Sequence, residues 1–188
     1  MFRLEVRPGL ELRQFELSDA ETVFAVADRN RARLREWLPW VDRTPSANEV
    51  REFIEGAIQQ WEEGLGPNTA IWLDGQIIGA MGSHRYDMPN RYCEVGYWID
   101  GAHSGKGIVT RCTAALVDWL FTEEQMHRVV IRCGTGNHRS CAVPERLGFT
   151  REGVLREAER VNDRWVDLVV WGVLEQEWRQ LRGSVDCA

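Results

Sequence analysis

The chain has 188 residues and a formal net charge of −6 at neutral pH, which fits a single domain of residues 1–188 able to bury about 70% of its unfolded surface. This charge argues against a general nucleic-acid binder. No apolar run approaches the ~20 residues of a membrane span, and the first residues lack the basic and apolar regions of a signal peptide. The five cysteines are odd in number and lack metal-site spacing, so we expect reduced thiols, no metal site and a cytoplasmic location.

The first quarter of the chain predicts one strand and two helical segments. Apolar and polar side chains alternate over residues 10–15, which predicts a strand. Ser18 with Glu21 three residues later has the spacing of a capping box, so a helix is expected to open at Ser18. A second helical segment is expected over 33–37, ending before the next proline, because a residue that precedes proline avoids the helical region.

A longer helix and a hairpin follow. Ser46 and Glu49 form a second capping box, which predicts a helix over 47–63. The dipeptide Asp74-Gly75 is a strong two-residue hairpin turn. The strands on either side of that turn are expected at 69–73 and 76–82.

The second half of the chain alternates strands with helices. The elements expected there are a strand at 92–99, a helix from 108, a strand at 128–133, a helix over about 140–147, a hairpin of 154–161 and 164–174, and a final helix ending near 182. Antiparallel hairpins that flank a single parallel crossover indicate an α/β domain with a mixed sheet.

The junction between strand 92–99 and the next helix carries the clearest chemical signal. Gly105 and Gly107 allow positive φ and a close approach of the main chain to a ligand. Backbone N–H groups and a helix N-terminus then converge on one point, which suits a phosphate. A dinucleotide fingerprint is excluded, because Thr110 stands where its third glycine would be, and the triphosphate loop spacing is absent. A plain strand-to-helix turn remains the alternative.

This junction resembles the acetyl-CoA pyrophosphate loop of the GCN5-related N-acetyltransferases (GNAT superfamily), whose consensus is Q/R-x-x-G-x-G/A. Within that superfamily the chain is most similar to the RimJ/RimL group, which acetylates protein N-termini, and particularly to its serine acetyltransferases. The segments that carry the resemblance are 12–20, 33–40, 94–110, 137–153 and 155–163. The resemblance implies a mixed, mostly antiparallel sheet, splayed at its centre and flanked by helices. One departure is Ala102, which occupies the consensus Gln/Arg position.

The resemblance also implies the residues that hold acetyl-CoA. The main chain of strand 92–99 is expected to pair with the pantetheine arm, the glycine loop to hold the pyrophosphate, and an asparagine side chain to contact pantetheine. These residues are Tyr97, Trp98, Ile99, His103, Ser104, Gly105, Lys106, Gly107, Ile108, Val109, Thr110 and Asn137.

Ser140 is the candidate acid toward the CoA sulfur. Many members of the superfamily use a tyrosine four residues further on, but here that place is Pro144, which has no proton to give. The serine acetyltransferases are credited with using the hydroxyl at the Ser140 position instead. The alternative is that Ser140 is a plain helix N-cap, and both roles can coexist.

Two carboxylates compete for the role of general base. Glu159 matches the position of the catalytic glutamate of the serine acetyltransferases, and we rank it first. Glu94 lies in an otherwise apolar strand, near where other acetyltransferases use a glutamate through bound water. For either residue the alternative is a solvated charge, the usual fate of glutamate.

The resemblance makes residues 33–40 the expected acceptor wall, with Arg33 and Trp40 as substrate-binding residues. The alternatives are a solvated helix face for Arg33 and core packing for Trp40, and Trp37 is expected in the core. The leading hypothesis is an acetyl-CoA-dependent N-acetyltransferase acting on the α-amine of a protein, such as a ribosomal protein. One alternative is a small amine acceptor, such as an antibiotic or an aminoacyl nucleotide. Another is a CoA-binding regulatory module without turnover. No nucleic-acid or membrane partner is expected, and a homodimer is possible.

Overall fold

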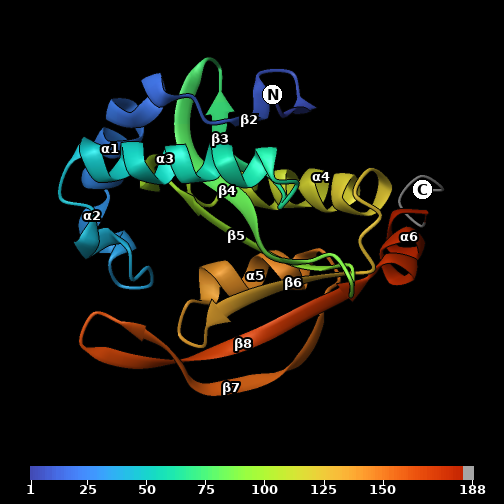
Figure 1. Cartoon of the computed structure of the whole chain (residues 1–188). Coiled ribbons are helices and arrows are strands. Elements are labelled where there is room, and N and C mark those ends of the chain that lie inside the picture. Colours follow the sequence, from blue (N-terminus) through green and yellow to red (C-terminus); the bar gives the residue numbers. More distant parts are fainter. Residues whose placement is uncertain (184–188) are drawn as a thin grey trace.

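The computed structural model describes residues 1–183, which build one 8-stranded sheet in the order β1-β2-β3-β4-β5-β6-β8-β7 (Figure 1). Neighbouring strands run antiparallel except β5 and β6, which are parallel. This is the mixed, mostly antiparallel sheet expected from the sequence. The strands are β1 Arg3–Arg7, β2 Leu10–Gln14, β3 Asn68–Leu73, β4 Gln76–Asp87, β5 Tyr92–Ile99, β6 Arg128–Gly134, β7 Thr150–Val161 and β8 Arg164–Leu174.

Helices cover both faces of this sheet (Figure 1). They are α1 Ala20–Asp28, α2 Arg31–Leu34, α3 Ala47–Glu62, α4 Ile108–Thr122, α5 His138–Arg146 and α6 Glu175–Gly183. Helices α1 and α3 pack their apolar residues on β3 and β4 in one cluster. Helix α4 and Trp178 of α6 pack on the opposite face, in the larger cluster that includes Cys93 and Val95 of β5. Alternate side chains of β5 therefore face different layers.

The helix starts were predicted with mixed success. Ser46 caps α3, since its side chain accepts from the Asn48 N–H and Glu49 bonds back to the Ser46 N–H, as predicted. The prediction of a capping box at Ser18 was wrong. The chain first makes a 3₁₀ turn, and Glu16 forms the reciprocal box with Asp19, so the N-terminal donors are satisfied two residues earlier.

The predicted bounds of several elements need correction. Strand β1 was not predicted, because it is an edge strand whose side chains are exposed or half-buried and therefore lack an apolar run. Strand β7 begins at Thr150, earlier than the expected residue 154. Strand β4 continues past the predicted end to Asp87, with a bulge before Asp87 where it pairs with β5. Helix α2 ends at Leu34, earlier than expected, and the chain then turns toward a 3₁₀ turn at Val41–Arg43.

The sheet divides between β5 and β6. These two strands pair only at Tyr92, Cys93 and Glu94 of β5, opposite Arg128 to Val130 of β6. Beyond Glu94 they diverge, as Figure 1 shows toward the end of β6. The second half of β5 keeps β4 as its neighbour on one side only. The expected splay at the centre of the sheet is therefore present.

Four cysteines of the described part of the chain are free thiols, three of them buried: Cys93, Cys112, Cys133 and Cys141. Cys187 lies outside the described residues. Among the helices of residues 1–183, none is both long and apolar enough to cross a membrane.

Candidate functional site

The loop between β5 and α4 has the geometry of an anion cradle. Gly105 and Gly107 both have positive φ, +76° and +71°, which other residues adopt only with strain. Gly107 is the N-cap of α4, so the first N–H groups of that helix and those of the loop are presented together. Nothing lies within 4 Å of where a Cβ would stand on Gly105, so this side of the loop is open to a ligand.

The main chain of Tyr97, Trp98 and Ile99 lies where β6 has left β5. These residues pair with Met81, Ala80 and Gly79 of β4 on one side. No β6 residue of the described chain pairs with them on the other side. A ligand with amide groups can add there as a strand would.

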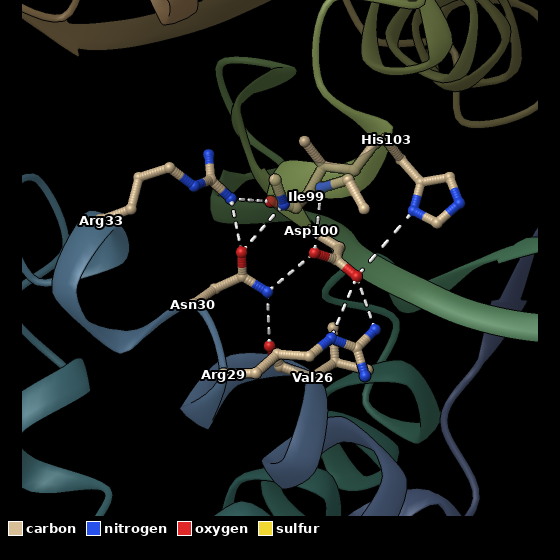
Figure 2. A network of polar contacts seen from close by, with 9 residues as sticks. Val26, Arg29, Asn30, Arg33, Ile99, Asp100 and His103 are labelled. Atoms are coloured by element: carbon tan, nitrogen blue, oxygen red, sulfur yellow. Dashed lines mark hydrogen bonds and ion pairs between the residues drawn. The ribbon is translucent and has the colours of Figure 1, made fainter.

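A buried polar network that was not predicted from the sequence holds the end of β5 (Figure 2). The Asp100 carboxylate accepts from Arg29 at 2.5 Å and 3.1 Å and from the Asn30 amide at 3.0 Å. The Asn30 oxygen in turn accepts from the Gly101 N–H at 2.9 Å. The Asn30 amide also donates to the Val26 carbonyl of α1 at 2.8 Å, so this side chain ties helix α1 to the start of the glycine loop.

Two predicted site residues join this network (Figure 2). Arg33 donates to the Ile99 carbonyl and, at 3.3 Å, to Asn30. The His103 ring lies 3.9 Å from the Asp100 carboxylate. The guanidinium of Arg33 thus contacts the strand expected to hold the ligand, and burial lowers the Arg33 pKa.

Replacing Asp100 by alanine is expected to lower the free energy of unfolding by about 2 kcal/mol, less than for a fully buried ion pair because Arg29 reaches solvent. Burial raises the pKa of Asp100, but hydrogen bonds from Arg29 and Asn30 outweigh it and lower that pKa to about 2. The stabilisation is therefore present above the unfolded pKa of about 3.9 and is lost as the pH falls toward 2.

Chemical denaturation of the parent and Asp100→Ala at pH 7 and at pH 2–4 checks this expectation. Asp28→Ala is the matched control, because Asp28 is an exposed partner of Arg31 and should cost well under 1 kcal/mol. Equal losses for the two variants would contradict the role given to Asp100.

Ser140 lies in the first turn of α5 but does not cap the helix. Asn137 is the N-cap, and its side-chain oxygen accepts from the Ser140 N–H at 3.2 Å. The capping alternative for Ser140 was therefore wrong, and the side-chain amide N–H₂ of Asn137 is the part left for another partner. The Ser140 hydroxyl lies 3.2 Å from the Cys133 sulfur and 3.4 Å from the Tyr97 hydroxyl.

Both candidate bases belong to one charged cluster. Glu94 is buried and accepts from Arg132 at 2.8 Å, while Arg85 lies 3.5 Å from its other oxygen. Burial raises the pKa of the half-buried Glu159, the charge of Arg132 opposes this and the charge of Glu94 adds to it. Glu94 is thus engaged in an ion pair with Arg132, whereas Glu159 has the raised pKa that suits a general base.

Aromatic rings line the segment that follows α2. The Trp40 ring lies against the Trp98 ring, with centroids 6.0 Å apart. Trp37, expected in the core, is half-buried and packs on the end of β6, where a Cβ on Gly134 would come within 2.9 Å of its ring. Arg164 of β8 lies over the same ring at 5.1 Å.

The distal hairpin β7–β8 closes onto this segment. The Asn162 side-chain amide donates to the Arg35 carbonyl at 2.6 Å, and Arg164 donates to the Glu36 carbonyl. These contacts join residues more than a hundred positions apart, so the hairpin that carries Glu159 is held against the predicted acceptor wall.

Three contributors were missed by sequence reasoning: Arg132, the Tyr97 hydroxyl and the Asn30–Asp100 pair. Neither Arg132 nor Asn30 stands out from the other polar residues of the chain. Tyr97 had one usable signal, because Pro144 removes a helical donor and leaves a carbonyl in need of a partner.

Comparisons with known proteins agree with this geometry. Residues 9–150 match the family described as "Acetyltransferase (GNAT) domain". A putative ribosomal N-acetyltransferase, YdaF of Bacillus subtilis, is 36% identical over 179 residues, covering 95% of this chain and 98% of YdaF. The ribosomal-protein-serine acetyltransferase of Escherichia coli is 28% identical, covering 88% of this chain and 92% of its own. A structure of the ribosomal L7/L12 α-N-protein acetyltransferase RimL with coenzyme A superposes with a TM-score of 0.89 at 26% identity, covering 92% and 98%.

Proposed function

We propose that this chain, which belongs to the GNAT acetyltransferases, is a single-domain enzyme that moves the acetyl group of acetyl-CoA to the N-terminal α-amine of a protein. Ribosomal proteins are the first candidates, because YdaF and RimL are named for them. The observation that carries the proposal is the position of the free β5 main chain between the glycine loop and Ser140.

The residues present fit acetyl-CoA. Positive φ at Gly105 and Gly107, with no side chain on the open face of Gly105, gives a cradle for the pyrophosphate that a larger residue would fill. The loop around them, His103 to Thr110, and the main chain of Tyr97 to Ile99 would hold the rest, with the Asn137 amide free to contact pantetheine. Bound there, acetyl-CoA supplies an activated acyl group.

The carboxylate cluster suits a weakly basic acceptor. An N-terminal α-amine has a pKa of about 7.7–8.0, so a carboxylate with a raised pKa is a sufficient base, whereas a lysine amine near 10.4 needs more help. Glu159 is the proposed base, while Glu94 orients Arg132 beside it. Ser140 is the proposed acid, which gives a proton to the leaving sulfur.

The same chemistry can serve a small amine. The Trp40–Trp98 pair offers aromatic surface on which a planar group can stack. This is the observation that favours the second candidate, in which the acceptor is an antibiotic or an aminoacyl nucleotide.

Release of free CoA from acetyl-CoA across an acceptor panel tests both candidates. The panel contains peptides with free or blocked N-termini, lysine-bearing peptides, polyamines, aminoglycosides and aminoacyl nucleotides. Turnover confined to free N-terminal peptides is the expected result and gives the preferred first residue. Turnover confined to a small amine would replace the proposed acceptor. Binding of acetyl-CoA without turnover of any acceptor would favour a regulatory module.

A further inference from the structure

Helix α5 has an unmade hydrogen bond at Ser140. Pro144 lies inside the helix, and proline has no N–H to donate to the carbonyl four residues earlier, which is that of Ser140. The proline ring also crowds that carbonyl and pushes it away from the helix axis. Ser140 is partly buried, and a carbonyl shielded from water and left without a donor is costly, so a partner from outside the helix is favoured.

The Tyr97 hydroxyl supplies this partner. It donates to the Ser140 carbonyl at 3.1 Å, although Tyr97 and Ser140 are 43 positions apart in the chain. Its oxygen also lies 3.4 Å from the Ser140 hydroxyl. One phenol therefore contacts both the main chain and the side chain of the proposed acid.

The two ends of Tyr97 serve different partners. Its main chain lies in the unpaired half of β5, where acetyl-CoA is expected to bind. Its side chain points into the layer that contains α4 and α5, where it contacts Ser140. Tyr97 alone thus links the strand expected to bind the cofactor to the proposed acid. An aromatic residue without a hydroxyl could not make this link.

We propose that Tyr97 is the positioning residue for Ser140, and that its hydroxyl replaces the helical donor that Pro144 removes. The inference rests on the role proposed for Ser140. Burial raises the pKa of Tyr97 well above its usual value, so the phenol remains a protonated donor wherever the enzyme works. The Asn137 cap fixes the Ser140 N–H at the same time, so the main chain of Ser140 is held at both its N–H and its carbonyl.

A mutant cycle between Tyr97 and Pro144 tests the proposal. Tyr97→Phe should lower kcat about tenfold with little change in the KM for acetyl-CoA, because the main chain that binds it is unaltered. Pro144→Ala restores a helical N–H to the Ser140 carbonyl. In that background the loss of kcat caused by Tyr97→Phe should shrink to less than about threefold.

Tyr86→Phe is the matched control, since it removes another half-buried phenol hydroxyl, one that lies 3.4 Å from Glu124. Its effect should be small and equal in both backgrounds. The same cycle is measured by chemical denaturation, where Tyr97→Phe should destabilise the protein less when residue 144 is alanine. Parental kcat in Tyr97→Phe, or an equal loss in both backgrounds, would overturn the proposal.

The unfolding cycle separates this inference from the proposed function. If the parent turns over no acceptor, the proposed function fails, whereas the coupling between Tyr97 and Pro144 in unfolding free energy still stands or falls by itself. If the unfolding cycle shows no coupling between Tyr97 and Pro144, the Tyr97 hydroxyl does not replace the helical donor, even if the enzyme is active.

Discussion

Glu159→Gln is expected to lower kcat by about 10²-fold, the lower end of the range for a lost general base. The amide keeps the size of the carboxyl group but cannot take the proton that the acceptor ammonium must lose before its neutral amine attacks the thioester. The loss is held to this end of the range because an α-amine near pKa 7.7–8.0 is already partly neutral at the working pH.

The pH dependence gives the same variant a second test. Because burial raises the pKa of Glu159, the acid limb of kcat/KM in the parent should lie above the ordinary glutamate range of about 4.3 and should disappear in Glu159→Gln. The same substitution is expected to raise stability while it lowers activity. A raised folded pKa means that the stabilisation by Glu159 is present below its unfolded pKa and is lost as the pH rises, so Glu159→Gln should have a higher Tm than the parent at pH 7.

Glu157→Gln is the matched control, because Glu157 lies on the same hairpin and is exposed. Its kcat and Tm should stay near those of the parent. If Glu159→Gln keeps the parental kcat and Glu94→Gln loses most of it, then Glu94 is the general base.

Ser140→Ala is expected to lower kcat by about 10²-fold with a nearly unchanged KM for acetyl-CoA. The hydroxyl is the proposed proton donor to the leaving sulfur, and alanine removes it without disturbing the Asn137 cap, which uses the Ser140 N–H. Steady-state kinetics with the best acceptor of the panel, followed by release of CoA, measures both constants.

Ser140→Thr separates the hydroxyl from the helix position, since threonine keeps the hydroxyl and should retain most of the activity. Circular dichroism of both variants checks that α5 is intact. If alanine and threonine reduce kcat equally, the defect lies in the packing of α5 and not in proton transfer.

Features that depend on residues close together in the chain could be predicted from local sequence. Asp74-Gly75 specified the β3–β4 hairpin, and both residues have the positive φ that such a turn needs. Ser46 and Glu49 specified the start of α3. The glycine loop and its family were recognisable because Gly105 and Gly107 stand at fixed spacing between a strand and a helix. In each case the deciding contacts span a few residues, so residue type and spacing are sufficient.

The assembly of the site could not be predicted in this way, because it depends on contacts between distant parts of the chain. Asn30 meets Asp100 and Glu94 meets Arg132 because the order of strands and the position of α1 bring them together. The divergence of β5 and β6 after Glu94 leaves Tyr97 between the cofactor strand and Ser140. These contacts join residues that are 38 to 70 positions apart. Such pairs are set by sheet register and by which face of a strand is buried, and neither is encoded in any short stretch of the chain.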